Sequence, residues 1–211
     1  MPRTLGYQSM TAVAAEHTPR TREVAPRRLD VDVLDDGQLA ERHLTGDPQA
    51  FGALVDRYQT RLLNFIHCAI GDPARAEDLV QEVFIRAFRH LRRFDRTKRF
   101  STWIYTIAST LAKTELRGRW WSPVDQRWPL QIVDVPADSD DLFSRAAVAE
   151  TVAQGVRRLP ESLRDVFVLR ELEGMSDQEI AEITGCDVGT VRTRLSRARS
   201  SFARAVEPLV T

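Results

Sequence analysis

Apolar residues recur at spacings of three and four along most of the chain, from about residue 35 onward. This is the period of amphipathic helices, whereas the alternation expected of strands is not sustained beyond a few positions. The sequence also contains no internal repeat and no strong hairpin signal. We therefore predict an all-α protein, built of two small helical domains that are joined by a flexible linker.

The first predicted domain, residues 35–119, is a bundle of four helices. A short helix around 36–44 precedes one that begins at Asp47-Pro48 and ends at Gly71. Asp72-Pro73 repeats this N-cap and proline signal, and Ser101 is the N-cap candidate of the fourth helix. The predicted inward residues of the last two helices are Ala76, Leu79, Val80, Val83, Phe84, Ala87, Phe88 and Leu91, then Trp103, Ile104, Ile107, Ala108 and Leu111.

The segments outside this bundle differ in composition. Residues 1–34 mix Arg, Pro, Thr and Glu without the apolar core of a signal peptide, which predicts a disordered tail and a cytoplasmic location. Residues 120–144 combine prolines with an acidic run, so they are predicted to be a linker. Residues 145–211 return to the helical period and form the second predicted domain, with one helix introduced by Leu159-Pro160 and closed by Gly174.

Within the second domain, residues 176–203 have the pattern of a helix-turn-helix. Ser176 and Glu179 form a capping box, and the short helix that they begin stops at Gly185. In the longer helix that follows, Val191, Leu195, Ala198 and Phe202 lie on the inward face. Such a pair of helices places the second one in the major groove of DNA.

The outward face of that longer helix is basic and rich in hydroxyl groups. Arginine can bond bidentately to guanine, while hydroxyl groups and backbone amides hold phosphates. The alternative is that these arginines only form a solvated helix face. The sequence argues against it because almost no acids alternate with them. The predicted duplex-DNA contacts are Thr190, Arg192, Thr193, Ser196 and Arg197.

The first domain contains a second basic segment, between residues 86 and 99, in which Asp95 is the one acid. It runs directly into Phe100, Trp103 and Tyr105, and cations beside aromatic rings suit single-stranded nucleic acid. The alternative is that the arginines are solvated and the rings are core. For Trp103 we favour the core, because it shares a face with Ile107.

The overall composition excludes several classes of protein. The formal net charge is zero, so any nucleic-acid surface must be a local patch. No window holds the roughly 18 apolar residues that a membrane span requires. The two cysteines, Cys68 and Cys186, are far apart and are predicted to be free thiols. His67 beside Cys68 lacks a second ligand pair, so we predict no metal and no cofactor.

Two regions of the chain, each containing two characteristic stretches, resemble the bacterial sigma-70 family and its extracytoplasmic-function (ECF) subgroup in particular. The sequence from Ala76 to Phe88, AEDLVQEVFIRAF, followed by FSTWIYTIA from Phe100, resembles the second conserved region of these sigma factors. VLRELEGMS from Val168 and VGTVRTRLSRAR from Val188 resemble the fourth. The two regions occur in the family's order and at its spacing over roughly two thirds of the chain, which makes the resemblance specific.

The resemblance implies a sigma factor that directs core RNA polymerase to promoter DNA. The helix-turn-helix would bind the −35 element, and the loop from about residue 94 with the following helix would hold the melted −10 element and a flipped base. An anti-sigma factor is the implied inhibitor. The polymerase-binding residues implied are Asp78, Gln81, Glu82 and Arg86, and those implied for single-stranded DNA are Arg96, Lys98, Arg99, Phe100, Tyr105, Thr106, Ser109, Thr110 and Lys113.

Two other hypotheses are weighed against this one. A regulator of the response type would share the helix-turn-helix, but the first domain shows neither phosphorylation-site chemistry nor a ligand-pocket pattern. An enzyme has little support, because the chain has no Gly-rich phosphate loop and no nucleophile motif, so no small-molecule substrate is predicted. The sequence leaves open the promoter, the regulated genes, the anti-sigma factor and its signal, the role of the tail, and any redox role of the cysteines.

Overall fold

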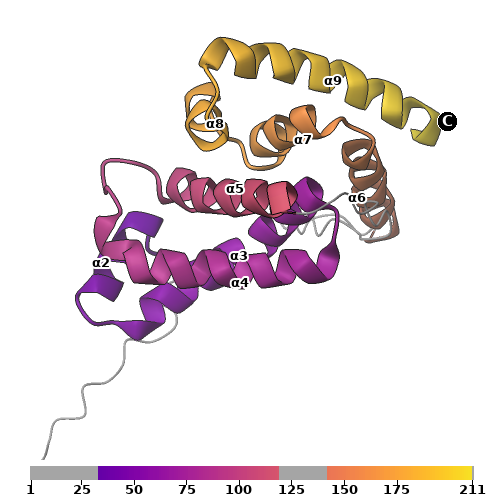
Figure 1. Cartoon of the computed structure of the whole chain (residues 1–211). Coiled ribbons are helices and arrows are strands. Elements are labelled where there is room, and N and C mark those ends of the chain that lie inside the picture. The colour runs from indigo at the N-terminus through magenta and orange to yellow at the C-terminus, as the bar shows by residue number, and fades with distance from the viewer. Residues whose placement is uncertain (1–32, 119–141, 211) are drawn as a thin grey trace, which may run out of the picture.

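The computed structural model describes residues 33–118 and 142–210, and all regular elements in these two ranges are helices (Figure 1). The predicted all-α class is confirmed. The predicted tail and most of the predicted linker lie outside the described residues. None of the described helices is long and apolar enough to cross a membrane.

The first domain consists of α2 (Asp36–Leu44), α3 (Pro48–Ile70), α4 (Pro73–His90), the short 3-10 helix η1 (Leu91–Arg93) and α5 (Phe100–Gly118). The predicted start signals are present. Asp47 accepts a hydrogen bond from the Gln49 amide at 2.9 Å, and Asp72 accepts one from the Arg75 amide at 3.0 Å. These caps satisfy amides that have no partner within the helix, while prolines at the first turn need none. Gly71 ends α3 in the left-handed region, at φ 73°.

Two predictions for this domain need correction. Helix α5 begins at Phe100, so Ser101 is a buried residue inside the first turn and does not act as the N-cap. Phe88, expected in the core, is 54% exposed and packs its ring on Phe51 and His43 at the rim of the bundle. The predicted inward placement of Trp103 is confirmed, since its partly buried ring packs against Phe94 and Phe100. The helical period shows which side of a helix a residue lies on. It does not show at which residue the helix begins, or how far the neighbouring helices extend to cover that side.

The second domain consists of α6 (Leu142–Arg157), α7 (Glu161–Phe167), the π-helix η2 (Val168–Leu172), α8 (Asp177–Thr184) and α9 (Val188–Val210). Helices α6, α7 and α8 all pack against α9, and Phe167 stacks on Phe202 at 4.7 Å between ring centroids. Gly155 lets α6 approach α9 closely, because a Cβ there would lie 2.5 Å from the Phe202 ring.

The two domains lie one on the other, with α5 of the first domain against α8 of the second and α3 against α7 (Figure 1). Because of this arrangement, the end of α3 is buried on all sides. Every residue from Asn64 to Ile70 is buried, including the polar Asn64 and His67. An amphipathic helix normally buries only its apolar face. Here α7 of the second domain covers the opposite face of α3 as well.

Candidate nucleic-acid interface

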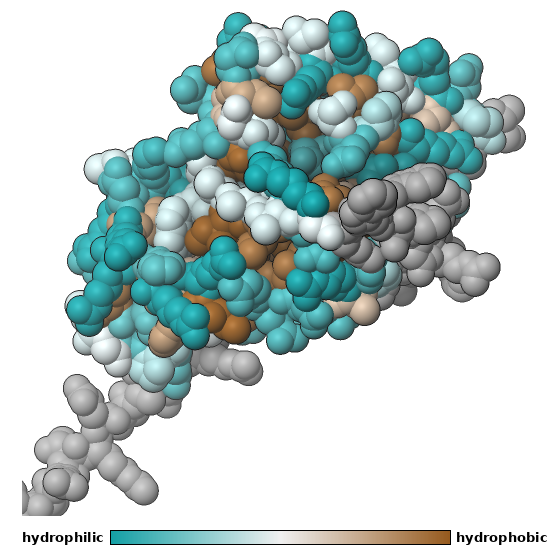
Figure 2. All heavy atoms as spheres, in the orientation of Figure 1, coloured by the Kyte–Doolittle hydropathy of each residue, from teal (hydrophilic) through white to brown (hydrophobic). Residues whose placement is uncertain are grey.

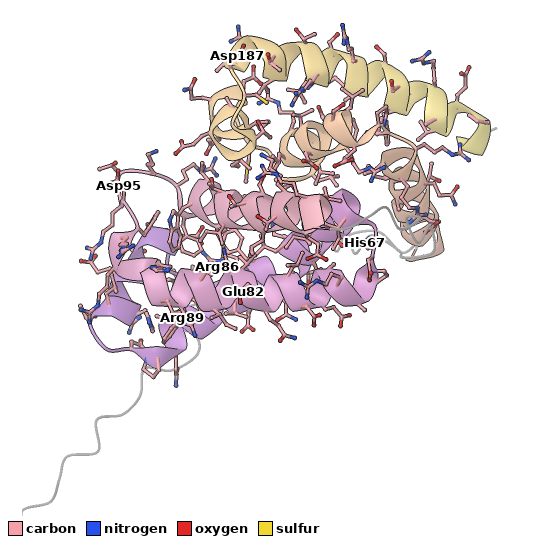
Figure 3. The ribbon with its side chains drawn as sticks, in the orientation of Figure 1. His67, Glu82, Arg86, Arg89, Asp95 and Asp187 are labelled. Atoms are coloured by element: carbon pink, nitrogen blue, oxygen red, sulfur yellow. The ribbon has the colours of Figure 1, made fainter. Side chains whose placement is uncertain are left out.

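The helix-turn-helix has the local structure that its sequence predicts. The Ser176 hydroxyl accepts the Glu179 amide, and the Glu179 carboxylate accepts the Ser176 amide at 2.9 Å, which completes the capping box. Gly185 ends α8 at φ 71°, a left-handed conformation that glycine adopts without steric cost. At the start of α9, Asp187 accepts the Thr190 amide at 2.8 Å (Figure 3). Hydrogen bonds from Thr190 lower the pKa of Asp187, so this cap is charged at neutral pH.

The outward face of α9 is solvent-exposed where DNA contacts are predicted. Val191, Leu195 and Ala198 are buried against the domain. Thr190 is the exception on the polar face, since it is only partly exposed and its hydroxyl donates to Asp187. The exposed candidates are Arg192, Thr193, Ser196 and Arg197.

The arginines of α9 have more acidic partners than the sequence indicates. Arg192 Nε lies 3.1 Å from an Asp177 carboxylate oxygen, and Arg199 Nη2 lies 2.7 Å from Glu171. These acids come from α8 and η2, so they do not appear in the local charge pattern. The Arg192–Asp177 pair and Arg199 border a groove of about 390 Å³ that Ser196 and Ser200 also line. The arginine side chains of the two pairs are 71% and 56% exposed, and such pairs are readily exchanged for phosphate or base contacts.

In the first domain, the loop between η1 and α5 presents the predicted cations to solvent. Arg96, Lys98 and Arg99 are all exposed. Asp95 holds the loop in shape by accepting the Thr97 amide at 3.0 Å and the Thr97 hydroxyl at 2.7 Å, and these bonds lower its pKa (Figure 3).

Three residues predicted to contact single-stranded DNA are buried instead. Phe100 is 2% exposed and packs on Tyr58 and Phe94, whereas Tyr105 is fully buried with its ring edge on Phe65. Ser109 is 3% exposed and lines a cavity between the domains. The prediction that these side chains face a base is wrong for this conformation, because Phe100 and Tyr105 lie on the core face of α5 and Ser109 faces the cavity between the domains. Of the other α5 candidates, Thr106 and Lys113 are partly exposed and Thr110 is exposed.

The residues implied for polymerase binding share one face of α4. Asp78, Gln81 and Arg86 are exposed, and Arg86 Nε donates to Glu82 at 2.7 Å (Figure 3). Asp78, Glu82 and Arg86 also line a cleft of about 480 Å³ between α4 and α5. Apolar surface is visible among hydrophilic side chains on this side of the first domain (Figure 2), and Ile85 on α4 is 43% exposed. A charged face with exposed apolar residues is suited to binding another protein.

Comparisons with known proteins identify the family to which the two domains belong. Residues 54–122 match the family model for sigma-70 region 2, and residues 150–201 match the model for sigma-70 region 4. The chain is 38% identical over 191 residues to the RNA polymerase sigma-H factor of Pseudomonas aeruginosa, covering 83% of this chain and 95% of that protein. It is 36% identical over 193 residues to the ECF RNA polymerase sigma-E factor of Escherichia coli K12, covering 84% and 97%.

The chain is an ECF sigma factor of the sigma-70 family. Its fold is similar to that of two solved structures. CnrH, in complex with the cytosolic domain of CnrY, matches with a TM-score of 0.58 and 25% identity over 82% of this chain and 97% of that one. The sigma factor RpoE of Bartonella quintana, in complex with the anti-sigma factor NepR, matches in fold with a TM-score of 0.52 over 73% and 96%.

The sigma factor also contains polar residues between its domains that sequence reasoning missed. Arg61 of α3 pairs with Glu173, its Nε lying 2.8 Å from the carboxylate. Arg164 of α7 is buried and donates to the backbone of α3. Asp165 lines the cavity between the domains, which measures about 510 Å³. No local pattern distinguishes Arg61 and Arg164 from solvated arginines, because Glu173 and Cys68 are about 100 positions away from them in the sequence.

Asp165 should make the stability of the sigma factor pH-dependent. Burial raises its pKa from 3.8 to about 6, although Lys113 opposes this shift, and one of its carboxylate oxygens has no hydrogen-bond partner among the described residues. A raised pKa means that the folded state binds the proton more tightly than the unfolded state does. Stability from this group is therefore greatest below pH 4 and falls as the pH rises through about 6.

We expect Asp165→Asn to be more stable than the wild type by about 1 to 2 kcal/mol above pH 7, because a neutral amide avoids the cost of burying the charge. The difference should shrink towards pH 4. Urea unfolding of both proteins across this pH range measures it, and taking the difference cancels the titration of other carboxylates. Asp56→Asn, at an exposed position of α3, is the matched control. A constant difference at all pH values would contradict the prediction.

Proposed function

We propose that this sigma factor gives core RNA polymerase its promoter specificity, by binding the −35 element as duplex and the −10 element as a melted strand. One observation carries the proposal: two exposed cationic surfaces of different character lie on separate domains. One is a helix-turn-helix face and the other is a basic loop beside a helix. Such a protein positions the polymerase and is not itself an enzyme. We propose that it acts in the cytoplasm.

The duplex contacts are assigned to the exposed side chains at the beginning of α9. Arg192, Thr193, Ser196 and Arg197 project from one helix face with no bulky apolar residue among them. A helix with this composition fits the major groove. Thr190 is better placed to hold the helix start than to bind DNA, since Asp187 already accepts its hydroxyl.

The melted strand is assigned to the loop cations Arg96, Lys98 and Arg99, together with Thr106, Thr110 and Lys113 on α5. The cations would hold the phosphates, and the hydroxyl groups can bond to an extruded base. Trp103, which retains partial exposure beside this loop, is the ring available for stacking in place of Phe100 and Tyr105.

Core polymerase is proposed to bind the face of α4 that contains Asp78, Gln81, Glu82 and Arg86. An anti-sigma factor is proposed as the inhibitor, supported by the similar fold of Bartonella quintana RpoE, which was solved in complex with the anti-sigma factor NepR. The proposal is tested by adding the purified protein to core polymerase and sequencing transcript 5′ ends on genomic templates. Initiation at sites with shared −10 and −35 motifs is expected, and initiation that stays at background overturns it.

A response-type regulator was the second hypothesis drawn from the sequence, and the matches of both domains to sigma-70 family models argue against it. It would shift promoter DNA in a gel without polymerase, usually as a dimer on two half-sites. The proposed sigma factor is expected to bind the promoter specifically only with polymerase present. The same labelled promoter fragment, with and without core polymerase, separates the two hypotheses.

Charge reversal on α4 should weaken polymerase binding. Asp78→Lys is expected to lower the affinity for core polymerase by about tenfold, because it places a cation on an exposed acidic face. Thermal stability should hardly change, since among the described residues Asp78 pairs only with Arg75, at 3.3 Å on the surface. Asp56→Lys makes the same charge change on α3 and should leave affinity within twofold. Equal losses in both variants would contradict the assignment.

A further inference from the structure

The cavity of about 510 Å³ between the domains has one apolar wall. Phe65 and Ala69 of α3 form it together with Ala112 and Leu116 of α5, and the first three of these side chains are buried. Because two of the four are alanines, the wall leaves space that larger side chains would fill. A cavity of this volume lies in the usual range for a small-molecule site, and its apolar wall suits the hydrocarbon part of a ligand.

Four charged side chains face the rest of the cavity, and none of them is paired with another. Glu161 and Asp165 lie one turn apart on α7, whereas Lys113 comes from α5 and Arg194 from α9. No ion pair joins any two of the four, so each carboxylate oxygen lies more than 4.0 Å from each cationic nitrogen. Opposite charges attract across such a space more strongly than in water. The fold holds them apart, which leaves room for a charged group between them.

These charged groups also have bonding capacity that the described residues do not use. One carboxylate oxygen of Asp165 has no hydrogen-bond partner among them, and burial raises the pKa of Asp165 to about 6. At neutral pH this carboxylate therefore lacks a donor that would stabilise its charge. The Lys113 ammonium makes one hydrogen bond, to the Thr184 carbonyl at 2.7 Å, and Arg194 Nη1 donates to the Cys186 sulfur at 3.1 Å. Both cations retain donors for a carboxylate.

A ligand with a single charge would complement only half of this cavity. A cation would suit Glu161 and Asp165 but would be repelled by Lys113 and Arg194, and an anion would meet the reverse. A ligand with an ammonium and a carboxylate side by side would complement both pairs of residues. Its uncharged part would then lie against the apolar wall.

We infer that this cavity binds a small zwitterion, namely an α-amino acid with an apolar side chain. Its ammonium pairs with Asp165 and Glu161, and its carboxylate pairs with Lys113 and Arg194. The inference goes beyond the proposed function, because it makes the sigma factor a receptor for a small molecule that acts as an effector and is not a substrate. The sequence does not show this site, since the lining residues come from four helices.

The first test compares three probes on the full chain by isothermal titration calorimetry at neutral pH. L-phenylalanine has both charges and an apolar ring, phenethylamine lacks the carboxylate, and 3-phenylpropanoate lacks the ammonium. L-phenylalanine should bind at one site per chain. Each analogue should bind at least about tenfold more weakly, because it loses one charged pair. L-leucine is titrated as a second apolar side chain, and the bound amino acid should raise the melting temperature as its concentration increases.

Asp165→Asn connects the binding to this cavity. The variant should bind L-phenylalanine about tenfold more weakly than the wild type, because the ammonium loses a charged partner. It should bind 3-phenylpropanoate at least as tightly as the wild type does, since that probe has no ammonium. A merely structural role of Asp165 would change both affinities in the same direction. Asp56→Asn, at an exposed position of α3, should leave both affinities unchanged, and circular dichroism checks that both variants keep their helix content.

The inference is overturned if neither L-phenylalanine nor L-leucine shows saturable binding to the wild type. An unchanged affinity of L-phenylalanine for Asp165→Asn also overturns it. If phenethylamine binds as tightly as L-phenylalanine, the cavity takes a cation alone and the inferred ligand class is wrong. None of these measurements involves DNA or polymerase, so the amino-acid site and the proposed promoter function can fail independently.

Discussion

Arg164→Ala is expected to lower the free energy of unfolding by about 3 to 5 kcal/mol, because a buried side chain that satisfies three carbonyl groups is lost. Arg164 is 8% exposed. Its guanidinium donates to the Cys68 carbonyl at 2.6 Å, to the Arg157 carbonyl at 3.0 Å and to the Leu159 carbonyl at 2.9 Å.

Two of these three carbonyl groups belong to the ends of helices. Cys68 lies in the last turn of α3, and Arg157 is the last residue of α6. The final carbonyls of a helix have no partner within it, and they carry the negative end of the helix dipole. One cation therefore stabilises two helix ends at once. In the alanine variant, carbonyl groups from both domains would be buried without a partner.

Urea unfolding followed by circular dichroism measures this effect. Arg158→Ala is the matched control, because the Arg158 side chain is exposed and makes a single hydrogen bond within the described part of the chain, to the Ala205 carbonyl at 2.7 Å. That variant should lose less than about 1 kcal/mol. Arg164→Lys should recover part of the loss, since an ammonium keeps the charge but lacks the planar fork of donors. If Arg164→Ala loses no more than the control, the assigned role is wrong.

Arg192→Ala and Arg197→Ala are each expected to weaken binding to the −35 element by about 1 to 3 kcal/mol, when polymerase is present, and to relax sequence choice at one position. Both side chains are exposed on the outer face of α9. Arg192→Ala also leaves Asp177 without this partner, but Arg170 remains 3.7 Å from that carboxylate.

The measurement compares polymerase binding on the selected promoter with binding on variants changed at single −35 positions. A loss confined to certain base pairs indicates base contacts, whereas an equal loss on every sequence indicates phosphate contacts and contradicts the prediction. Arg204→Ala, near the far end of the same helix, is the control. Arg204 Nε donates to the Ser200 carbonyl at 3.3 Å, and the variant should leave sequence choice unchanged.

The helices and their ends were accessible from the sequence because they depend on neighbouring residues. The caps at Asp47, Asp72 and Ser176 and the left-handed glycines at Gly71 and Gly185 occur where the pattern predicts them. The same is true of the outer face of α9, since three buried positions at helical spacing determine which side chains point away. The domain boundaries and the functions of the individual site residues remain predictions.

What the sequence alone determined is therefore the helical class, the helix-turn-helix and the family. Only the tertiary structure decided that Phe100 and Tyr105 are core, that α3 is buried on its polar side, and that acids of α8 occupy Lys98 and Arg99. The physical reason is the range of the interactions. Caps and helical periods act over three or four residues, whereas burial and ion pairing depend on surfaces that the fold brings together from about 80 residues away, between Lys98 and Glu182 for example.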